Sequence, residues 1–164
     1  MAYRFDDVKI LLVDDSETMS DMIGSVLRAL GSGCVLTAAN GLEALDIVTR
    51  EQVDLVITDW RMTPVDGLEL VRRMRSGAEQ QDRFVPIVMM TAYTEPERVT
   101  EALAAGVSDI LVKPVTVNLL CKRLTRLIEK PRPFVKTDSY FGPMHTPPTA
   151  PAAPVDDPVF ELEG

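Results

Sequence analysis

The fold is decided by residues 8–19, VKILLVDDSETM. The first six of these residues are aliphatic or β-branched apart from one lysine, which predicts a strand buried on both faces. Two aspartates end the run. Apolar residues at helical spacing then occupy 17–30, and Gly31-Ser32-Gly33 ends that helix. The stretch therefore predicts one β–α unit with acidic side chains at the carboxyl end of its strand.

The same alternation continues to about residue 130. Further strands are expected at 34–38, 54–58, 85–90 and 109–112, and further helices with Asn40 as N-cap, from Leu68, over 97–105 and over 115–129. Five β–α units predict a parallel sheet covered by helices on both faces. We expect an α/β, flavodoxin-like fold with strand order 2-1-3-4-5, because a closed barrel would need about 250 residues. Such a fold has its functional site at the carboxyl ends of the strands.

Composition divides the chain into a domain over 1–130 and a tail over 131–164. The tail holds eight of the twelve prolines and includes the polyproline-like stretch 147–154. We expect it to be partly disordered or to dock, since its aromatic residues suit packing on the domain or on a neighbour; they are Phe134, Tyr140 and Phe141. A proline-rich tail of this length predicts no separate output domain.

Overall composition excludes several classes of function. The net charge is −8 and no basic patch stands out, which disfavours direct binding of nucleic acid. No apolar run reaches the roughly 20 residues of a membrane span, and no signal peptide is recognisable. Cys34 and Cys121 fit no disulfide or zinc pattern, so buried reduced thiols and a cytoplasmic location are expected. The single histidine, His145, lies in the tail, which argues against a catalytic triad.

Polar residues follow four of the predicted strands. Asp14 and Asp15 follow the first strand, Asp59 the third, Thr91 the fourth and Lys113 the fifth. Three neighbouring carboxylates need a counter-charge, and Mg²⁺ prefers such oxygen ligands. A nucleophilic carboxylate beside a metal, a lysine and a hydroxyl donor suits phosphoryl transfer. One such aspartate is often only a turn or cap residue, but the conjunction is improbable by coincidence.

These strand ends resemble those of the response-regulator receiver (CheY-like) family. The matching stretches, spread over residues 6–130, are ILLVDDSETM, DLVITDWRMTPVDGLEL, PIVMMTAYTE and SDILVKPV. The resemblance implies that Asp59 is the phosphoacceptor, Thr91 the switch hydroxyl and Lys113 the contact to the phosphoryl group. It also implies a set of Mg²⁺ ligands, namely Asp14, Asp15, Asp59 and the backbone carbonyl of Arg61. The family usually has a cis bond before the proline that matches Pro114.

Three positions depart from the family pattern. Ile110 stands where an aromatic switch residue is frequent, so output would rely on backbone shifts or on Tyr93. Pro64 comes one place later than usual. Arg61 and Tyr93 are bulky at positions that flank the path of the attacking water, and we hypothesise slow self-dephosphorylation. Trp60 is expected either as a partly exposed contact or as a packing residue.

The resemblance implies a two-component response regulator that catalyses only its own phosphorylation and dephosphorylation. Its phosphoryl group would come from a histidine kinase or a histidine phosphotransfer protein, and its target would be an unidentified protein. A homodimer is compatible with the sequence. Two alternatives stay open, a receiver fold that docks without phosphorylation and a phosphate sink. A Mg²⁺-dependent phosphatase is disfavoured, because it would usually have a second aspartate where Arg61 stands.

Overall fold

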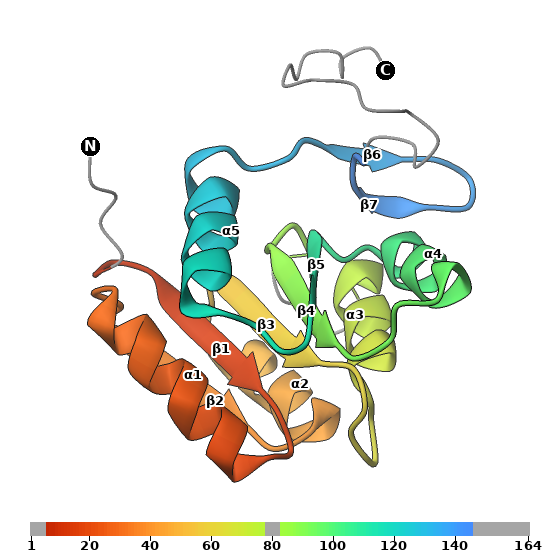
Figure 1. Ribbon diagram of the computed structural model, residues 1–164. Coiled ribbons are helices and arrows are strands. Elements are labelled where there is room, and N and C mark those ends of the chain that lie inside the picture. The colour runs from red at the N-terminus through yellow and green to blue at the C-terminus, as the bar shows by residue number, and fades with distance from the viewer. Residues whose placement is uncertain (1–5, 78–82, 146–164) are drawn as a thin grey trace.

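The computed structural model describes residues 6–77 and 83–145. Five strands and five helices alternate within the first part of these residues (Figure 1). They are β1 (Lys9–Val13), α1 (Glu17–Ala29), β2 (Cys34–Ala38), α2 (Gly41–Arg50), β3 (Leu55–Asp59), α3 (Gly67–Ser76), β4 (Ile87–Thr91), α4 (Pro96–Ala105), β5 (Asp109–Val112) and α5 (Val117–Glu129). The strands are parallel in the order β2-β1-β3-β4-β5, which confirms the predicted fold.

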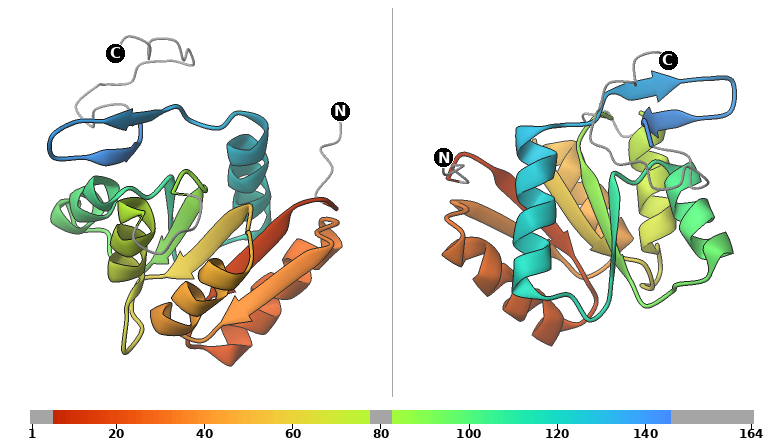
Figure 2. Two further views of the ribbon diagram at one scale, coloured as in Figure 1. Left: turned by 180° about the vertical axis from the view of Figure 1, so that it is seen from behind. Right: turned by 45° about the horizontal axis from the view of Figure 1, so that its top comes forward.

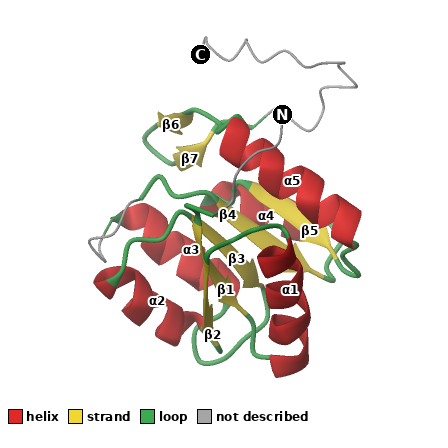
Figure 3. Cartoon of the chain, turned by 90° about the vertical axis from the view of Figure 1, so that its left-hand side faces the viewer, coloured by secondary structure: helices red, strands yellow, loops and turns green. Residues whose placement is uncertain are grey.

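Helices cover both faces of the sheet, and successive strand residues point to opposite faces. Figures 2 and 3 show α1 and α5 on one side and α2, α3 and α4 on the other. Ile10 and Leu12 of β1 pack in the core beneath α1 and α5, whereas Leu11 and Val13 pack in the opposite core. All four are fully buried, and each contributes roughly 1.5–3 kcal/mol to stability. This double burial explains why the strand is an unbroken apolar run.

Side-chain caps fix the start of every helix except α4. The capping residues accept hydrogen bonds from the first turns of α1, α2, α3 and α5; they are Ser16, Asn40, Asp66 and Thr116. Asn40 thereby confirms its predicted role. Glu95 caps α4 without a side-chain hydrogen bond, and only Ala102 and Ala105 of this helix are buried. Since one cap contributes about 1 kcal/mol, the start of α4 lacks a stabilisation that the other four helices have.

Two strands end later than the sequence predicted. β3 includes Asp59, which pairs with Met90, and β4 includes Thr91, which pairs with Val112. Their polar side chains had suggested that the strands stop one residue earlier. Parallel pairing extends through them, so both residues lie on the last rungs of the sheet instead of in loops. The start of α5 shifts from 115 to 117 because Thr116 is its cap.

A β-hairpin follows α5 at the amino end of the sheet (Figures 1 and 2). Its antiparallel strands are β6 (Phe134–Lys136) and β7 (Phe141–Pro143). The rings of Phe134 and Phe141 lie 5.1 and 5.4 Å from the ring of Phe84, which belongs to the loop before β4. The first part of the predicted tail therefore folds onto the domain. The polyproline-like stretch lies outside the described residues, and the boundary at residue 130 stays a prediction.

Arg75 of α3 links the hairpin to the domain through hydrogen bonds and a contact with an aromatic ring. Its side chain is only 3% exposed and donates hydrogen bonds to the backbone carbonyls of Gly106, Arg83 and Val85 over 2.7–2.9 Å. Its guanidinium also lies 4.8 Å from the centre of the Phe134 ring. A buried charge with this many acceptors is well satisfied, so the residue acts as a structural cross-link.

The end of the hairpin is held by His145. Its Nε2 atom lies 2.8 Å from the carbonyl oxygen of Val107, just before β5. Burial lowers the pKa of His145, and the nearby Arg132 lowers it further. The neutral imidazole is therefore favoured in the docked hairpin.

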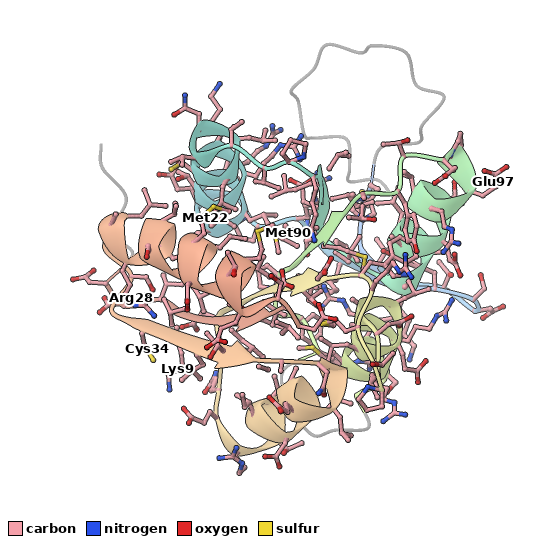
Figure 4. The ribbon with its side chains drawn as sticks, turned by 60° about the horizontal axis from the view of Figure 1, so that its bottom comes forward. Lys9, Met22, Arg28, Cys34, Met90 and Glu97 are labelled. Carbon is pink, nitrogen blue, oxygen red and sulfur yellow. The ribbon has the colours of Figure 1, made fainter. Side chains whose placement is uncertain are left out.

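The cysteines are free and only half-buried, so the expectation of buried thiols was wrong in degree. Cys34 lies on the edge strand β2 beside Lys9 of β1 (Figure 4), whereas Cys121 lies on α5. An edge strand leaves more side chain accessible than a central one, which explains the exposure of Cys34. Within the described residues, no helix combines the length and apolarity that a membrane span requires.

Candidate functional site

Three carboxylates converge at the carboxyl end of the sheet. Asp14 and Asp15 follow β1 directly, and Asp59 is the last residue of the neighbouring β3. One carboxylate oxygen from each lies within 4.8 Å of the other two. Lys113, which follows β5, places its Nζ atom 3.0 Å from Oδ1 of Asp59. The structure thus brings together four of the residues that the sequence singled out.

Among these groups, Asp14 has the negative charge that its surroundings stabilise least. The residue is 3% exposed, and its Oδ1 accepts a hydrogen bond of 2.9 Å from the backbone N–H of Ser16. Its Oδ2 is buried and has no hydrogen-bond partner among the described residues. Burial raises the pKa of Asp14, the bond from Ser16 opposes this rise, and the charge of Asp59 adds to it. A buried oxygen without a donor suits coordination to a cation.

Asp59 is oriented by one hydrogen bond and one ion pair. Its Oδ1 accepts a hydrogen bond of 2.9 Å from the backbone N–H of Trp60 and forms an ion pair with the ammonium of Lys113. The backbone N–H of Lys113 donates in turn to the carbonyl of Thr91 at 2.8 Å, which fixes β5 beside β4. The peptide bond between Lys113 and Pro114 is cis, as the family resemblance implies.

Thr91 lies at the end of β4 and is almost completely buried. Its Oγ1 accepts a hydrogen bond of 2.9 Å from the backbone N–H of Tyr93. The Tyr93 ring meets the Trp60 ring edge-on, with 5.1 Å between their centres. Trp60 itself is 4% exposed, so it is a packing residue and the partly exposed alternative was wrong.

The loop after β3 is tied back onto that strand. The N–H of Gly67 donates to the carbonyl of Trp60 at 2.8 Å, and a Cβ atom on Gly67 would collide with the carbonyl oxygen of Asp59. The peptide bond between Thr63 and Pro64 within the loop is cis. Arg61 directs an exposed side chain outward from this loop. The proline shift seen in the sequence therefore leaves the position of the glycine unchanged.

The remaining predicted residue, Ile110, lies on β5 and is half-buried against the core beneath α2, α3 and α4. One residue that sequence reasoning missed is Arg98 of α4. Its guanidinium carbon lies 4.3 Å from the centre of the Tyr93 ring and 5.7 Å from that of Trp60. An arginine in the first turns of an amphipathic helix looks like a solvated residue, so only the structure reveals this contact.

The chain matches the family model of the response regulator receiver domain over residues 10–125. A chemotaxis protein CheY homolog of Campylobacter jejuni is 42% identical over 118 residues, which cover 71% of this chain and 89% of that protein. Chemotaxis protein CheY-3 of Vibrio cholerae is 36% identical over 124 residues, covering 76% and 94% of the two chains.

Solved structures with the same fold include two informative relatives. Chemotaxis response regulator CheY4 of Vibrio cholerae has a TM-score of 0.67 and 37% identity, and the match covers 73% of this chain and 98% of that one. The receiver domain of a sensor histidine kinase from Pseudomonas aeruginosa has a TM-score of 0.68 and 32% identity, with 75% and 98% covered. A magnesium ion is coordinated in the active-site cleft of the latter protein.

Proposed function

This chain belongs to the response regulator receiver domain family, and we propose that it is a switch controlled by phosphorylation of Asp59. One observation carries the proposal: three carboxylates meet at the carboxyl ends of β1 and β3, and one of them has a buried oxygen without a hydrogen-bond partner in the described part of the chain. Lys113 supplies a cation beside Asp59. The site therefore suits both a divalent metal and an anionic phosphoryl group.

We expect Mg²⁺ to be the metal. Asp14, Asp15, Asp59 and the backbone carbonyl of Arg61 would hold it, and the unpaired Oδ2 of Asp14 fits a ligand position. When bound, Mg²⁺ offsets the repulsion between a carboxylate and an incoming phosphoryl group. The magnesium in the Pseudomonas relative supports this choice of ion.

In the proposed transfer, a carboxylate oxygen of Asp59 attacks the phosphorus of a phosphohistidine. The new O–P bond forms as the N–P bond breaks, and the bonding electrons and a proton stay with the departing imidazole. Lys113 neutralises phosphoryl oxygens, and the hydroxyl of Thr91 turns to donate a hydrogen bond to one of them. The donor would be a histidine kinase or a histidine phosphotransfer protein acting in the cytoplasm. The receiver of the signal would be another protein.

The phosphoryl group should be long-lived. By the family resemblance, Tyr93 and Arg61 occupy positions that flank the path of the attacking water; both side chains are large, and the Tyr93 ring packs edge-on against Trp60. Both would limit the approach of water in line with the bond to be broken. Decay of the acyl phosphate should therefore accelerate in Arg61→Ala and Tyr93→Ala, and unchanged lifetimes in both variants would refute this idea.

Intact-mass measurement tests the proposal directly. The full chain is incubated with acetyl phosphate and Mg²⁺, and we expect it to gain the mass of one phosphoryl group. Asp59→Asn should gain none. Asp54→Asn is the matched control, since Asp54 lies at the opposite end of β3 and accepts a hydrogen bond from Lys9. A wild-type chain that stays unmodified with this donor and with candidate kinases would favour the phosphorylation-independent docking module. Phosphorylation without any change in partner binding would favour the phosphate sink.

A further inference from the structure

Two neighbouring aromatic residues contact the proposed phosphorylation site through their backbones. The N–H of Trp60 donates to Oδ1 of Asp59, and the N–H of Tyr93 donates to Oγ1 of Thr91, each over 2.9 Å. The two rings meet edge-on. A rearrangement of Thr91 therefore acts on Tyr93, and a rearrangement of Asp59 acts on Trp60. Because the two rings touch, either movement reaches both residues.

Arg98 of α4 lies over both of these rings. A guanidinium at these distances is attracted by the negative ring faces, and the attraction is modest at an exposed site. It belongs to the first turn of a helix whose cap lacks a side-chain hydrogen bond. Glu97, the preceding residue, lies on the outer side of the helix (Figure 4). The contact of Arg98 with the rings thus holds the start of α4, where no side-chain cap does so.

We propose that Arg98 is a positioning residue that couples the phosphorylation site to α4 through Tyr93 and Trp60. This inference rests on the proposed function and extends it to a further residue. In the structure, Arg98 contacts the Tyr93 ring, and the N–H of Tyr93 donates a hydrogen bond to the hydroxyl oxygen of Thr91.

The coupling follows from what Thr91 must do when a phosphoryl group arrives. Turning its hydroxyl toward that group removes the acceptor of the Tyr93 N–H. Tyr93 is then free to shift, which separates its ring from Arg98 and loosens the first turns of α4. By linkage, the reverse also holds, so that weakening the Arg98 contact favours the Thr91 orientation that stabilises phosphorylation. A cation over two touching rings takes the place of the aromatic contact that Ile110 cannot provide.

The test uses full-length Arg98→Met, Arg98→Lys and a matched control. In the absence of any phosphodonor, amide hydrogen exchange in the first turns of α4 should accelerate about two- to fivefold in Arg98→Met, the factor expected from losing an exposed cation–π contact. Arg98→Lys keeps the charge and should stay closer to the wild type. Arg72→Met is the control, because Arg72 contacts α4 through Glu101 at 3.7 Å and touches neither ring.

A second measurement connects the contact to the chemistry. With acetyl phosphate and Mg²⁺, Arg98→Met should be phosphorylated about two- to fivefold faster than the wild type, and Arg72→Met at the wild-type rate. In a Tyr93→Leu background, Arg98→Met should add no further change. The midpoint of urea unfolding should barely move, which separates positioning from a general loss of structure.

The two proposals fail in different ways. If no variant is ever phosphorylated, the proposed function is wrong, while the exchange of α4 amides still decides whether Arg98 holds the helix. If phosphorylation proceeds but Arg98→Met changes neither α4 exchange nor the phosphorylation rate, the coupling role of Arg98 is overturned. Equal effects of Arg98→Met in the wild-type and Tyr93→Leu backgrounds would also overturn it.

Discussion

The two ends of the sheet differ in how well a buried charged side chain is satisfied by hydrogen bonds. At the amino end, Arg75 is buried and donates to three backbone carbonyls. At the carboxyl end, Asp14 is equally buried, yet one of its oxygens has no hydrogen-bond partner among residues 6–77 and 83–145, and two further carboxylates lie nearby. The satisfied charge stabilises the fold, whereas the unsatisfied one leaves a place for an ion. The unsatisfied charge thus lies at the end of the sheet where we propose the functional site.

The largest difference between the ends should appear when Arg75 is replaced. Arg75→Met leaves three buried carbonyls without their donor, and we expect the free energy of unfolding to fall by about 3–5 kcal/mol. Urea denaturation measures this change. Arg73→Met on the same helix is the control, since Arg73 makes an exposed pair with Glu69 and should contribute less than about 0.5 kcal/mol. If the two substitutions lowered the free energy of unfolding equally, the stabilising role of the buried Arg75 charge would be refuted.

The second effect concerns Mg²⁺ at the opposite end. An ion that binds only the folded state at one hundred times its Kd should raise the free energy of unfolding by about 2.7 kcal/mol. Thermal unfolding with Mg²⁺ and with EDTA measures the gain. Asp14→Asn should abolish most of it, whereas Asp54→Asn, at the other end of β3, should retain it. If the stability of the wild-type chain did not change with Mg²⁺, the proposed ion site would be contradicted.

The third prediction asks whether the ends are independent. Phe141 contacts Phe84, Phe134 and the guanidinium of Arg83, which lies 3.8 Å from its ring. Phe141→Ala should reduce the free energy of unfolding by about 2 kcal/mol and increase amide exchange in the hairpin. Lys136→Ala, an exposed change in the same hairpin, is the control. Phosphorylation of Asp59 should be unaffected, and a large change in its rate would show that the ends are coupled.

The smallest effect is the pH dependence at the amino end. The pKa of His145 is lowered in the folded chain, so its contribution to stability is complete above the ordinary value of about 6.5 and is lost as pH falls through the lower folded value. Between about pH 7.5 and 5, the wild type should therefore lose more stability than His145→Gln does. Urea denaturation at both pH values checks this. Parallel pH curves for the two proteins would exclude a role for this imidazole.

Sequence reasoning succeeded best where burial leaves few options. Strands buried on both faces appear as short apolar runs, and the residues after such runs must gather at one edge of a parallel sheet. That logic predicted the fold, and it named Asp14, Asp15, Asp59 and Lys113, which the structure brings together. The roles of these residues remain proposals. The ends of β3 and β4 were misplaced, since a polar last rung looks like the start of a loop, and the starts of β4 and α5 were each placed two residues too early.

The features that the sequence did not predict depend on distant partners. Arg75 belongs to an arginine-rich helix end that looks solvated, and its acceptor Gly106 comes 31 positions later. The strands of the hairpin have three residues each, too few to show alternation, and their stability comes from contacts with Phe84. The role proposed for Arg98 likewise depends on its contact with aromatic rings outside α4, which the sequence does not reveal.

The hairpin also determines where the chain can be joined to other proteins. His145 lies beside Val107 at the amino end of β5, and Asp6 precedes β1 at the same edge of the sheet. Both junctions therefore lie on the side remote from the carboxylates. A fluorescent reporter fused at either junction should leave phosphotransfer intact, and insertion of the domain into a loop of a host enzyme would turn both connections toward that host.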